Sequence, residues 1–135
     1  MFVTIGEIIE KVPVVSRNTR CEDVNHIFSE NVVLDGVVVC DEENPIGLVM
    51  KTKFFQKLST KYGFDLFMQR TISLVMDISY LVVDSSLSAL EVSNLAMNRR
   101  PDSVYDYVVV TTKGSYVGVV SIRDLLLKLA EIQVN

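Results

Sequence analysis

The chain contains an internal repeat, and this repeat restricts its fold more than any other feature of the sequence. Residues 13–16 (PVVS) match residues 81–84 (LVVD), and residues 46–49 (IGLV) match residues 117–120 (VGVV). Such a repeat is typical of a supersecondary unit that cannot bury its apolar face alone and packs against a second copy of itself. We therefore expect one fold unit, present twice.

Each copy is predicted to begin with a short strand followed by a helix. The first strands are the valine-rich runs that end at Val15 and Val83. A hydroxyl residue with a glutamate three positions later marks a helix N-terminus, because the two side chains satisfy each other's backbone N–H groups. The two pairs of this kind are Thr19 with Glu22, and Ser88 with Glu91.

Two further strands and a second helix complete each copy. The predicted strands are residues 37–40 and 46–50 in the first copy, and 108–111 and 116–121 in the second. They are nearly continuous in valine and isoleucine, which indicates burial on both faces. The second copy carries three additional residues near its polar segment 99–103, where a loop insertion is tolerated. The last helix carries one apolar stripe, made of Leu125, Leu126, Leu129 and Ile132.

These elements predict an α+β fold with two β-α-β-β-α copies, residues 1–60 and 61–135, packed about a pseudo-twofold axis. A single copy of about 65 residues with so apolar a sheet is not expected to be stable alone. Helical stretches at residues 5–11 and 73–77 lead into the copies. The segments 54–58 and 62–68 between the copies are too apolar for a free linker and are expected to be packed helix.

Composition excludes several classes of function. The formal net charge is −4, which argues against a nucleic-acid surface and against docking on anionic lipid. No apolar stretch is long enough to cross a bilayer, no signal peptide is visible, and we expect a reduced, cytoplasmic protein. The single histidine, His26, and two cysteines, Cys21 and Cys40, provide neither a metal site nor a catalytic nucleophile with its base. The sequence therefore predicts a binding module, not an enzyme.

Residues 118–124 (GVVSIRD) form the motif that ends the second copy and opens its last helix. Together with the duplicated architecture, this motif resembles a tandem cystathionine-β-synthase (CBS) domain pair, or Bateman module, over nearly the whole chain. Segment 62–77 and residues 105–107 are similar to the narrower branch found in bacterial signalling proteins with GGDEF or EAL domains, which make and degrade cyclic di-GMP. The resemblance implies adenine nucleotides (AMP, ADP or ATP) as regulatory ligands, bound in clefts between the copies.

The start of the last helix has chemistry that suits such a ligand. Its backbone N–H groups and helix dipole favour an anion. Ser121 adds a hydroxyl, Arg123 a bidentate cation, and Asp124 acceptor oxygens that suit a ribose diol. Ser121 and Asp124 are also common at helix starts for purely structural reasons, as an N-cap and as a charge that favours the dipole. The resemblance adds six residues expected to flank the base: Val83, Asp84, Ser85, Asp106, Tyr107 and Val108.

The first copy departs from this motif, and one residue of the second copy limits the ligand. Met50 stands where the serine is expected, and Lys53 where the aspartate is expected. A lysine cannot accept from ribose hydroxyls, so the first copy is not expected to hold a nucleoside in the usual way. Asp106 lies where a basic residue is common in nucleotide-binding members, and its charge opposes a polyphosphate. A monophosphate, a nucleoside or no ligand is favoured over a triphosphate.

Four residues around this motif allow either a structural role or a ligand contact. Arg99 and Arg100 are expected at a loop surface, although both are also able to reach an anion. Tyr105 and Tyr107 are predicted to alternate along a strand and to point to one side, to stack on a base or to cover the core edge.

The sequence thus predicts a regulatory module that controls an attached effector domain, such as a diguanylate cyclase or phosphodiesterase. The alternative is a ligand-free scaffold that holds two effector domains together. CBS pairs commonly associate into twofold dimers, so a homodimer is expected in both cases. A free-standing enzyme is the least favoured class, because no catalytic constellation can be assembled from these residues.

Overall fold

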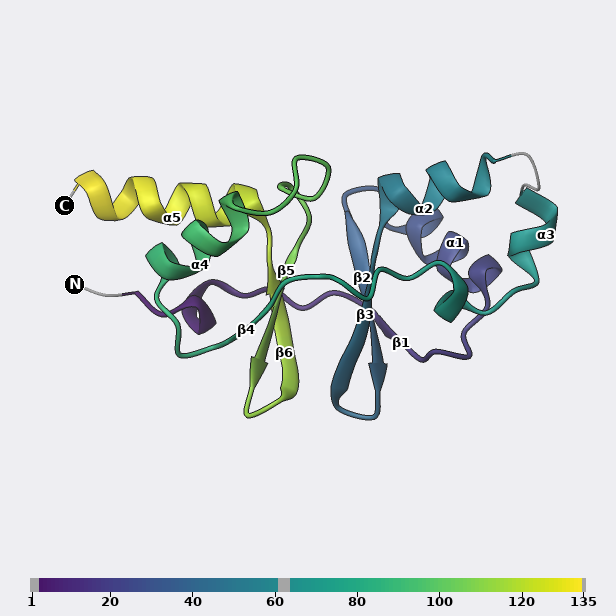
Figure 1. Ribbon diagram of the computed structural model, residues 1–135, viewed down its shortest axis with the longest axis horizontal. Helices are drawn as coiled ribbons and strands as arrows, with labels where there is room; N and C mark the ends of the chain where they lie inside the picture. The colour runs from purple at the N-terminus through teal and green to yellow at the C-terminus, as the bar shows by residue number, and fades with distance from the viewer. Residues whose placement is uncertain (1–2, 61–63, 135) are drawn as a thin grey trace. The chain divides into compact units, whose positions relative to one another are not determined.

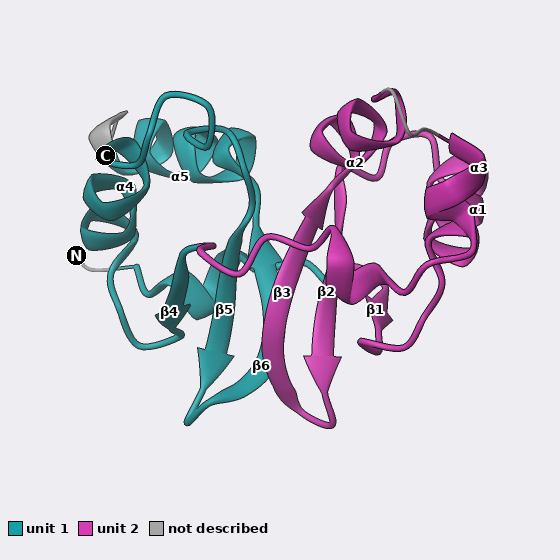
Figure 2. Cartoon of the chain, turned by 45° about the vertical axis from the view of Figure 1, so that its right-hand side comes forward, with its two compact units in different colours: residues 1–11, 81–135 teal, residues 12–80 magenta. Residues whose placement is uncertain are grey.

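A computed structural model describes residues 3–60 and 64–134 of the chain. It divides into two compact units, Val12–Tyr80 and a second unit that combines Met1–Lys11 with Leu81–Asn135 (Figure 2). We call these the central unit and the terminal unit. Within the described residues, no helix is long and apolar enough to span a membrane.

The central unit contains the first copy of the repeat. Its elements are β1 (Val14–Val15), α1 (Cys21–Glu30), β2 (Gly36–Asp41), β3 (Asn44–Met50), α2 (Lys51–Leu58), α3 (Phe64–Met68) and the 3₁₀ helix η2 (Ile72–Leu74) (Figure 1). The sheet has the order β1-β2-β3, with β1 parallel and β3 antiparallel to β2. The predicted segment 62–68 is helical from Phe64, and residues 62 and 63 lie outside the described residues.

The terminal unit has the same topology. Its elements are the 3₁₀ helix η1 (Ile5–Ile8), β4 (Val82–Asp84), α4 (Ala89–Met97), β5 (Val108–Thr112), β6 (Ser115–Val120) and α5 (Ile122–Val134). The sheet order is β4-β5-β6, again with one parallel and one antiparallel pair. The predicted α+β fold with two β-α-β-β-α copies is confirmed, and the additional residues of the second copy lie in the segment between α4 and β5.

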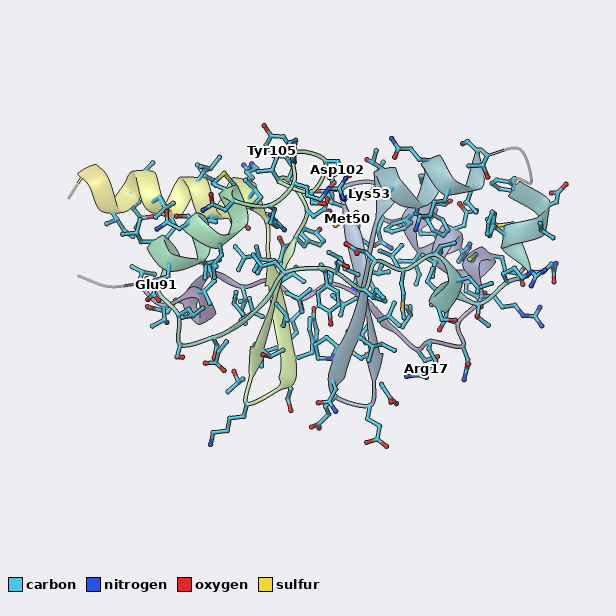
Figure 3. The ribbon with its side chains drawn as sticks, in the orientation of Figure 1. Arg17, Met50, Lys53, Glu91, Asp102 and Tyr105 are labelled. Carbon is cyan, nitrogen blue, oxygen red and sulfur yellow. The ribbon has the colours of Figure 1, made fainter. Side chains whose placement is uncertain are left out.

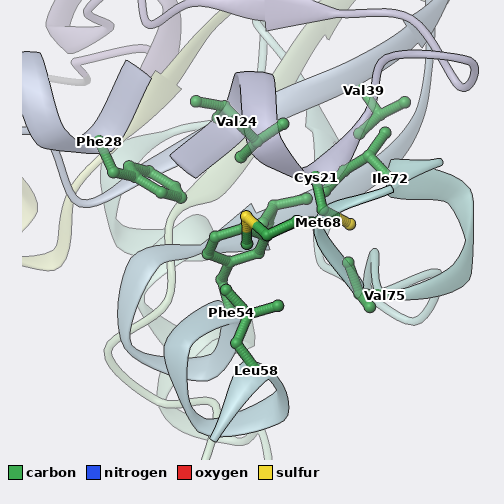
Figure 4. Close-up of a cluster of buried hydrophobic side chains, with 11 residues drawn as sticks. Cys21, Val24, Phe28, Val39, Phe54, Leu58, Met68, Ile72 and Val75 are labelled. Carbon is green, nitrogen blue, oxygen red and sulfur yellow. The ribbon is translucent and has the colours of Figure 1, made fainter. Parts of the chain in front are cut away.

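The central strands are buried on both faces, as their continuous valine runs predict. Val37 and Val39 of β2 contribute to a cluster under the helices, while Val38 between them is fully buried on the other face. Phe54 of α2 lies at the centre of this cluster (Figure 4), with its ring centroid 5.6 Å from that of Phe28. Transfer of these side chains from water is the main term that stabilises the unit.

The segment that leads into each copy packs on the other copy. Ile5 in η1 is fully buried in the core of the terminal unit, and its N–H donates to the Leu87 carbonyl (2.7 Å). Ile72 in η2 is fully buried in the core of the central unit, and its N–H donates to the Thr19 carbonyl (2.7 Å). The compact units therefore differ from the sequence copies, because these two segments are exchanged between them.

Only one of the two predicted capping boxes is present. Ser88 caps α4, since its hydroxyl accepts from the Glu91 N–H (3.1 Å) and Glu91, labelled in Figure 3, returns the contact. The prediction for Thr19 is wrong. Helix α1 begins one residue too late for it, at Cys21 after Arg20, and the Thr19 hydroxyl instead accepts from the N–H of Ser16 (3.1 Å). A box that the sequence analysis missed joins Thr4 and Glu7 at η1.

Replacing Ser88 by alanine is expected to lower the free energy of unfolding by about 1 kcal/mol, because the N–H of Glu91 loses its acceptor. Replacement by glycine is expected to cost only a few tenths of a kcal/mol, since glycine leaves the N–H accessible to water. Urea unfolding of both variants measures the difference. Equal losses for the two would contradict the capping role.

Candidate functional site

The start of α5 lies beside the start of β5. Val108, the first residue of β5, pairs with Val120, the last residue of β6, and Ser121 follows directly. The Ser121 hydroxyl accepts from the Asp124 N–H (3.1 Å), and its carbonyl accepts from the Leu125 N–H (3.0 Å). Ser121 therefore caps α5, and the sheet register brings this cap next to residues 106–108.

Asp124 and Arg123 present a carboxylate and a guanidinium at this helix start. The Asp124 side chain is 37% exposed and that of Arg123 is 82% exposed, with 3.6 Å between Nη1 and Oδ1. An exposed pair at this separation contributes little to stability, because water screens it and both side chains lose entropy. Both groups are thus accessible to an external partner, within the first turn of a helix whose dipole is positive there.

Asp106 and Tyr107, directly before β5, are buried, and Arg99 contacts the backbone of this segment. The guanidinium donates to the carbonyls of Val104 (3.0 Å), Asp106 (3.0 Å) and Tyr107 (3.4 Å). Burial lowers the pKa of Arg99, while the charge of Asp106 acts in the opposite direction. Arg99 and Arg100 were expected at a loop surface. This is confirmed for Arg100, whose side chain is 87% exposed. It is wrong for Arg99, which is half-buried because its guanidinium donates to three main-chain carbonyls.

Tyr105 and Tyr107 do not share one side of a strand, contrary to the prediction. Strand β5 begins only at Val108, and the two tyrosines belong to the irregular segment before it. Tyr105, labelled in Figure 3, is 79% exposed, whereas Tyr107 is buried. The alternation argument fails because it requires an extended backbone that this segment lacks.

The end of β4 lies at the opposite end of the sheet. Strands β4 and β5 are parallel, with Asp84 opposite Thr111, so residues 84 and 85 lie beside the hairpin turn and away from α5 (Figure 1). The Asp84 carboxylate accepts from the hydroxyl (2.6 Å) and N–H (3.0 Å) of Ser86, and these bonds lower the pKa of Asp84. Ser85 shares a hydrogen bond with Thr112 (2.7 Å).

The structure therefore separates the predicted site residues into two groups. The group that it brings together at the start of α5 consists of Asp106, Tyr107, Val108, Ser121, Arg123 and Asp124. Asp84 and Ser85 lie at the hairpin end, and Val83 is a buried residue of the core. We call the first group the α5 edge.

The comparisons with known proteins identify the family. The sequence model of the CBS domain matches the chain twice, over residues 5–60 and 72–131. The chain belongs to the CBS domain family. Its two copies form a CBS pair, and no curated protein matches the chain.

Solved structures of CBS proteins share this fold. A CBS-domain-containing protein of unknown function from Bacillus anthracis aligns with a TM-score of 0.81 and 13% identity, covering 96% of this chain and 94% of that chain. CBSX2 in complex with AMP aligns with a TM-score of 0.74 and 18% identity, covering 96% and 98%. A conserved CBS domain protein from Thermoplasma acidophilum aligns with a TM-score of 0.74 and 25% identity, covering 94% and 69%.

The first copy of this CBS pair lacks the polar groups of the α5 edge. Met50 precedes α2, and both Met50 and Lys53 are labelled in Figure 3. Within residues 3–60 and 64–134, no side chain caps α2 and no acidic residue stands in its first turn. The Lys51 ammonium donates to the Val32 carbonyl (2.9 Å) and lies 5.9 Å from the centre of the Phe28 ring. Lys51 is therefore engaged in holding the loop before β2.

Two cysteines and one histidine lie outside the α5 edge. Cys21 and Cys40 are buried free thiols, and burial raises the pKa of both. His26 is exposed on α1, 3.3 Å from the Glu30 carboxylate. Among the described residues, no group of three or more histidine, cysteine, aspartate or glutamate side chains is placed to hold a metal ion.

Proposed function

We propose that this CBS pair is a regulatory, non-catalytic module that binds adenosine or AMP at the α5 edge. The observation that carries the proposal is the pairing of Val108 with Val120, which places the Ser121 cap and the Asp124 carboxylate beside the backbone of residues 106–108. A helix N-terminus and a hydroxyl suit a phosphate, and a carboxylate suits a ribose diol. CBSX2, which has the same fold, was solved in complex with AMP.

Charge at the α5 edge favours a small anion over a polyphosphate. Asp106 and Asp124 contribute acidic groups, while the Arg99 guanidinium is occupied by backbone carbonyls. Arg123 alone adds an exposed cation to this group of residues. Repulsion therefore grows with each added phosphate, and we expect affinity to fall from AMP to ADP to ATP. In this proposal Asp84 and Ser85 stabilise the hairpin end and do not contact the ligand.

The consequence of binding is proposed to be a shift in the state of an attached effector domain. A ligand changes such an equilibrium only through different affinity for the two states. A diguanylate cyclase or phosphodiesterase with a GGDEF or EAL domain, in the cytoplasm of a bacterium, is the effector that the sequence features favour. Co-expression of the module with its parent protein's effector and an activity assay with and without AMP tests this step.

Replacing Asp124 by alanine is expected to weaken AMP binding at least tenfold, because a charge-assisted hydrogen bond to the ribose contributes about 1.5 to 3 kcal/mol. Calorimetry with AMP, ADP and ATP on wild type and variant measures the change. The matched control is Asp84→Ala, which removes a carboxylate from the same sheet at its other end and is expected to leave AMP affinity unchanged. An unchanged affinity in Asp124→Ala, or an equal loss in Asp84→Ala, would contradict the assignment.

A ligand-free scaffold is the second candidate, because α4 and α5 expose apolar side chains. Leu90 on α4 and Leu126 and Leu127 on α5 are each more than half exposed. Leu126 was predicted to belong to the apolar stripe of α5; it stands about 100° around the helix from the buried Leu125, and its side chain is exposed. A stable homodimer by light scattering, with no nucleotide binding at millimolar concentration, would favour the scaffold.

A further inference from the structure

The loop before β5 is contacted at several main-chain carbonyls by one side chain, that of Arg99. It joins the end of α4 at Met97 to the start of β5 at Val108, and its residues form neither helix nor strand. Two turn hydrogen bonds lie within it, from the Ser103 N–H to the Arg100 carbonyl (2.9 Å) and from the Asp106 N–H to the Ser103 carbonyl (3.0 Å). Local bonds of this kind shape the turns, and attachment of the loop to the end of α4 needs contacts of longer range.

Arg99 provides that attachment. Its Nε donates to the Ala96 carbonyl (3.0 Å) in the last turn of α4, and its Nη2 donates to the carbonyls of both Val104 and Asp106 (3.0 Å each). Its Nη1 reaches the Tyr107 carbonyl at 3.4 Å. A planar guanidinium holds its donors in a fixed fork, so these contacts fix the carbonyls relative to the helix end.

The corresponding loop of the first copy is shorter, and fewer side-chain hydrogen bonds to its carbonyls are needed to hold it. It runs from the end of α1 at Glu30 to the start of β2 at Gly36, and Lys51 contacts one of its carbonyls, that of Val32. A lysine ammonium is a compact charge with three rotatable N–H donors on a flexible stem, and it does not match four carbonyls held in a fixed arrangement. The longer loop of the second copy is thus contacted by arginine, which has more hydrogen-bond donors than the lysine that contacts the shorter loop of the first copy.

We propose that Arg99 is a positioning residue of the α5 edge. It acts through the main chain, holding residues 104–107 in the conformation that receives the ligand without touching the ligand itself. This inference rests on the proposed function. Without the Arg99 side chain the loop samples many conformations. Only the fraction of molecules with the loop in the binding conformation can bind the ligand, so the apparent affinity falls in proportion to that fraction.

The test compares Arg99→Gln and Arg99→Lys with the matched controls Arg100→Gln and Arg100→Lys. Arg100 is the neighbouring residue, and its side chain is 87% exposed. Calorimetry with AMP is expected to show at least a tenfold loss of affinity in both Arg99 variants, with a more unfavourable binding entropy. Both Arg100 variants are expected to match wild type. Lysine is not expected to rescue, because it cannot span the carbonyls.

Hydrogen exchange separates positioning from general destabilisation. In the Arg99 variants without ligand, the amides of residues 104–107 are expected to exchange faster than in wild type, while those of β2 and β3 remain protected. Saturating AMP is expected to restore protection to residues 104–107. A merely structural role would not produce this ligand-dependent recovery.

Two results would overturn the positioning role, and they differ in what they say about the proposed function. If wild type binds AMP and the Arg99 variants bind it with the same affinity and entropy, the positioning role is overturned and the proposed function stands. If wild type binds no adenine nucleotide or nucleoside, the proposed function is overturned and the positioning role falls with it. The Arg99→Lys variant, which keeps the charge, serves the test if Arg99→Gln fails to fold.

Discussion

Replacing Ile5 by alanine is expected to lower the free energy of unfolding of the terminal unit by about 2 to 5 kcal/mol, the usual range for truncation of a buried isoleucine. Ile5 has no exposed surface and belongs to the core cluster formed with Val108, Val110 and Leu125. Val108 and Val110 are held in β5 and Leu125 in α5, while η1 itself is bonded to the Ser85 and Leu87 carbonyls, so the surroundings cannot collapse fully into the space that the side chain leaves.

The location of the damage is the distinctive part of this prediction. Ile5 precedes the first copy in sequence, yet hydrogen exchange is expected to show lost protection in β5, β6 and α4, far along the chain. Ile72→Ala is the mirror experiment and is expected to affect β2 and α1 of the central unit. Leu74→Ala, in a residue that is 60% exposed, is the control and is expected to change the free energy by less than about 0.5 kcal/mol.

Chemical denaturation and hydrogen exchange together check this result. If Ile5→Ala reduced protection in β2 and β3 and left β5 and β6 unchanged, the exchange of the lead-in segments would be contradicted.

Local pattern was sufficient for the duplicated topology. The valine runs at residues 37–40 and 108–111, and the serine–glutamate pair at Ser88 and Glu91, each carry their structural signal within a few residues. The exchange of η1 and η2 carries no such signal. Ile5 contacts a helix start more than 80 residues away, and nothing within its own segment distinguishes one copy from the other as its partner.

The contacts at one helix start follow from local sequence, whereas the placement of Asp84 follows from strand direction. Ser121 and Asp124 are three residues apart, and their contact is local. The distance of Asp84 from them was also within reach of sequence reasoning, because a β-α-β crossover makes β4 parallel to β5 and sets their C-terminal ends side by side. The contacts of Arg99 could not be predicted from the sequence, because a main-chain carbonyl accepts from any donor that the fold brings near it and so requires no particular residue type.

Gly118, the first residue of the motif at the α5 edge, is expected to be required for packing and not for ligand contact. A Cβ built on Gly118 lies 2.8 Å from the Glu10 carbonyl oxygen and 3.0 Å from the Ile9 Cβ. The backbone of Glu10 is fixed there, because its N–H and carbonyl both bond Val119 (2.9 Å each). Gly118→Ala must therefore displace a β-bridge, and we expect a loss of about 2 to 3 kcal/mol in the free energy of unfolding.

The equivalent glycine of the first copy offers a matched control. A Cβ at Gly47 lies 2.5 Å from Sδ, 2.8 Å from Cγ and 3.0 Å from Cβ of Met76. Rotation of the methionine side chain moves Sδ and Cγ aside, so that the tight contact with the Met76 Cβ is the one that remains. Gly47→Ala is accordingly expected to cost less than about 1.5 kcal/mol, so the two variants separate a backbone clash from a side-chain clash at the same topological position. Urea unfolding of both variants measures the difference.

Ligand binding provides a second readout for Gly118→Ala. Because Gly118 is separated from the α5 edge by Val119 and Val120, the AMP affinity of the folded variant is expected to remain within twofold of wild type. A large loss of affinity in a Gly118→Ala protein that is fully folded would show instead that the glycine is needed at the ligand itself.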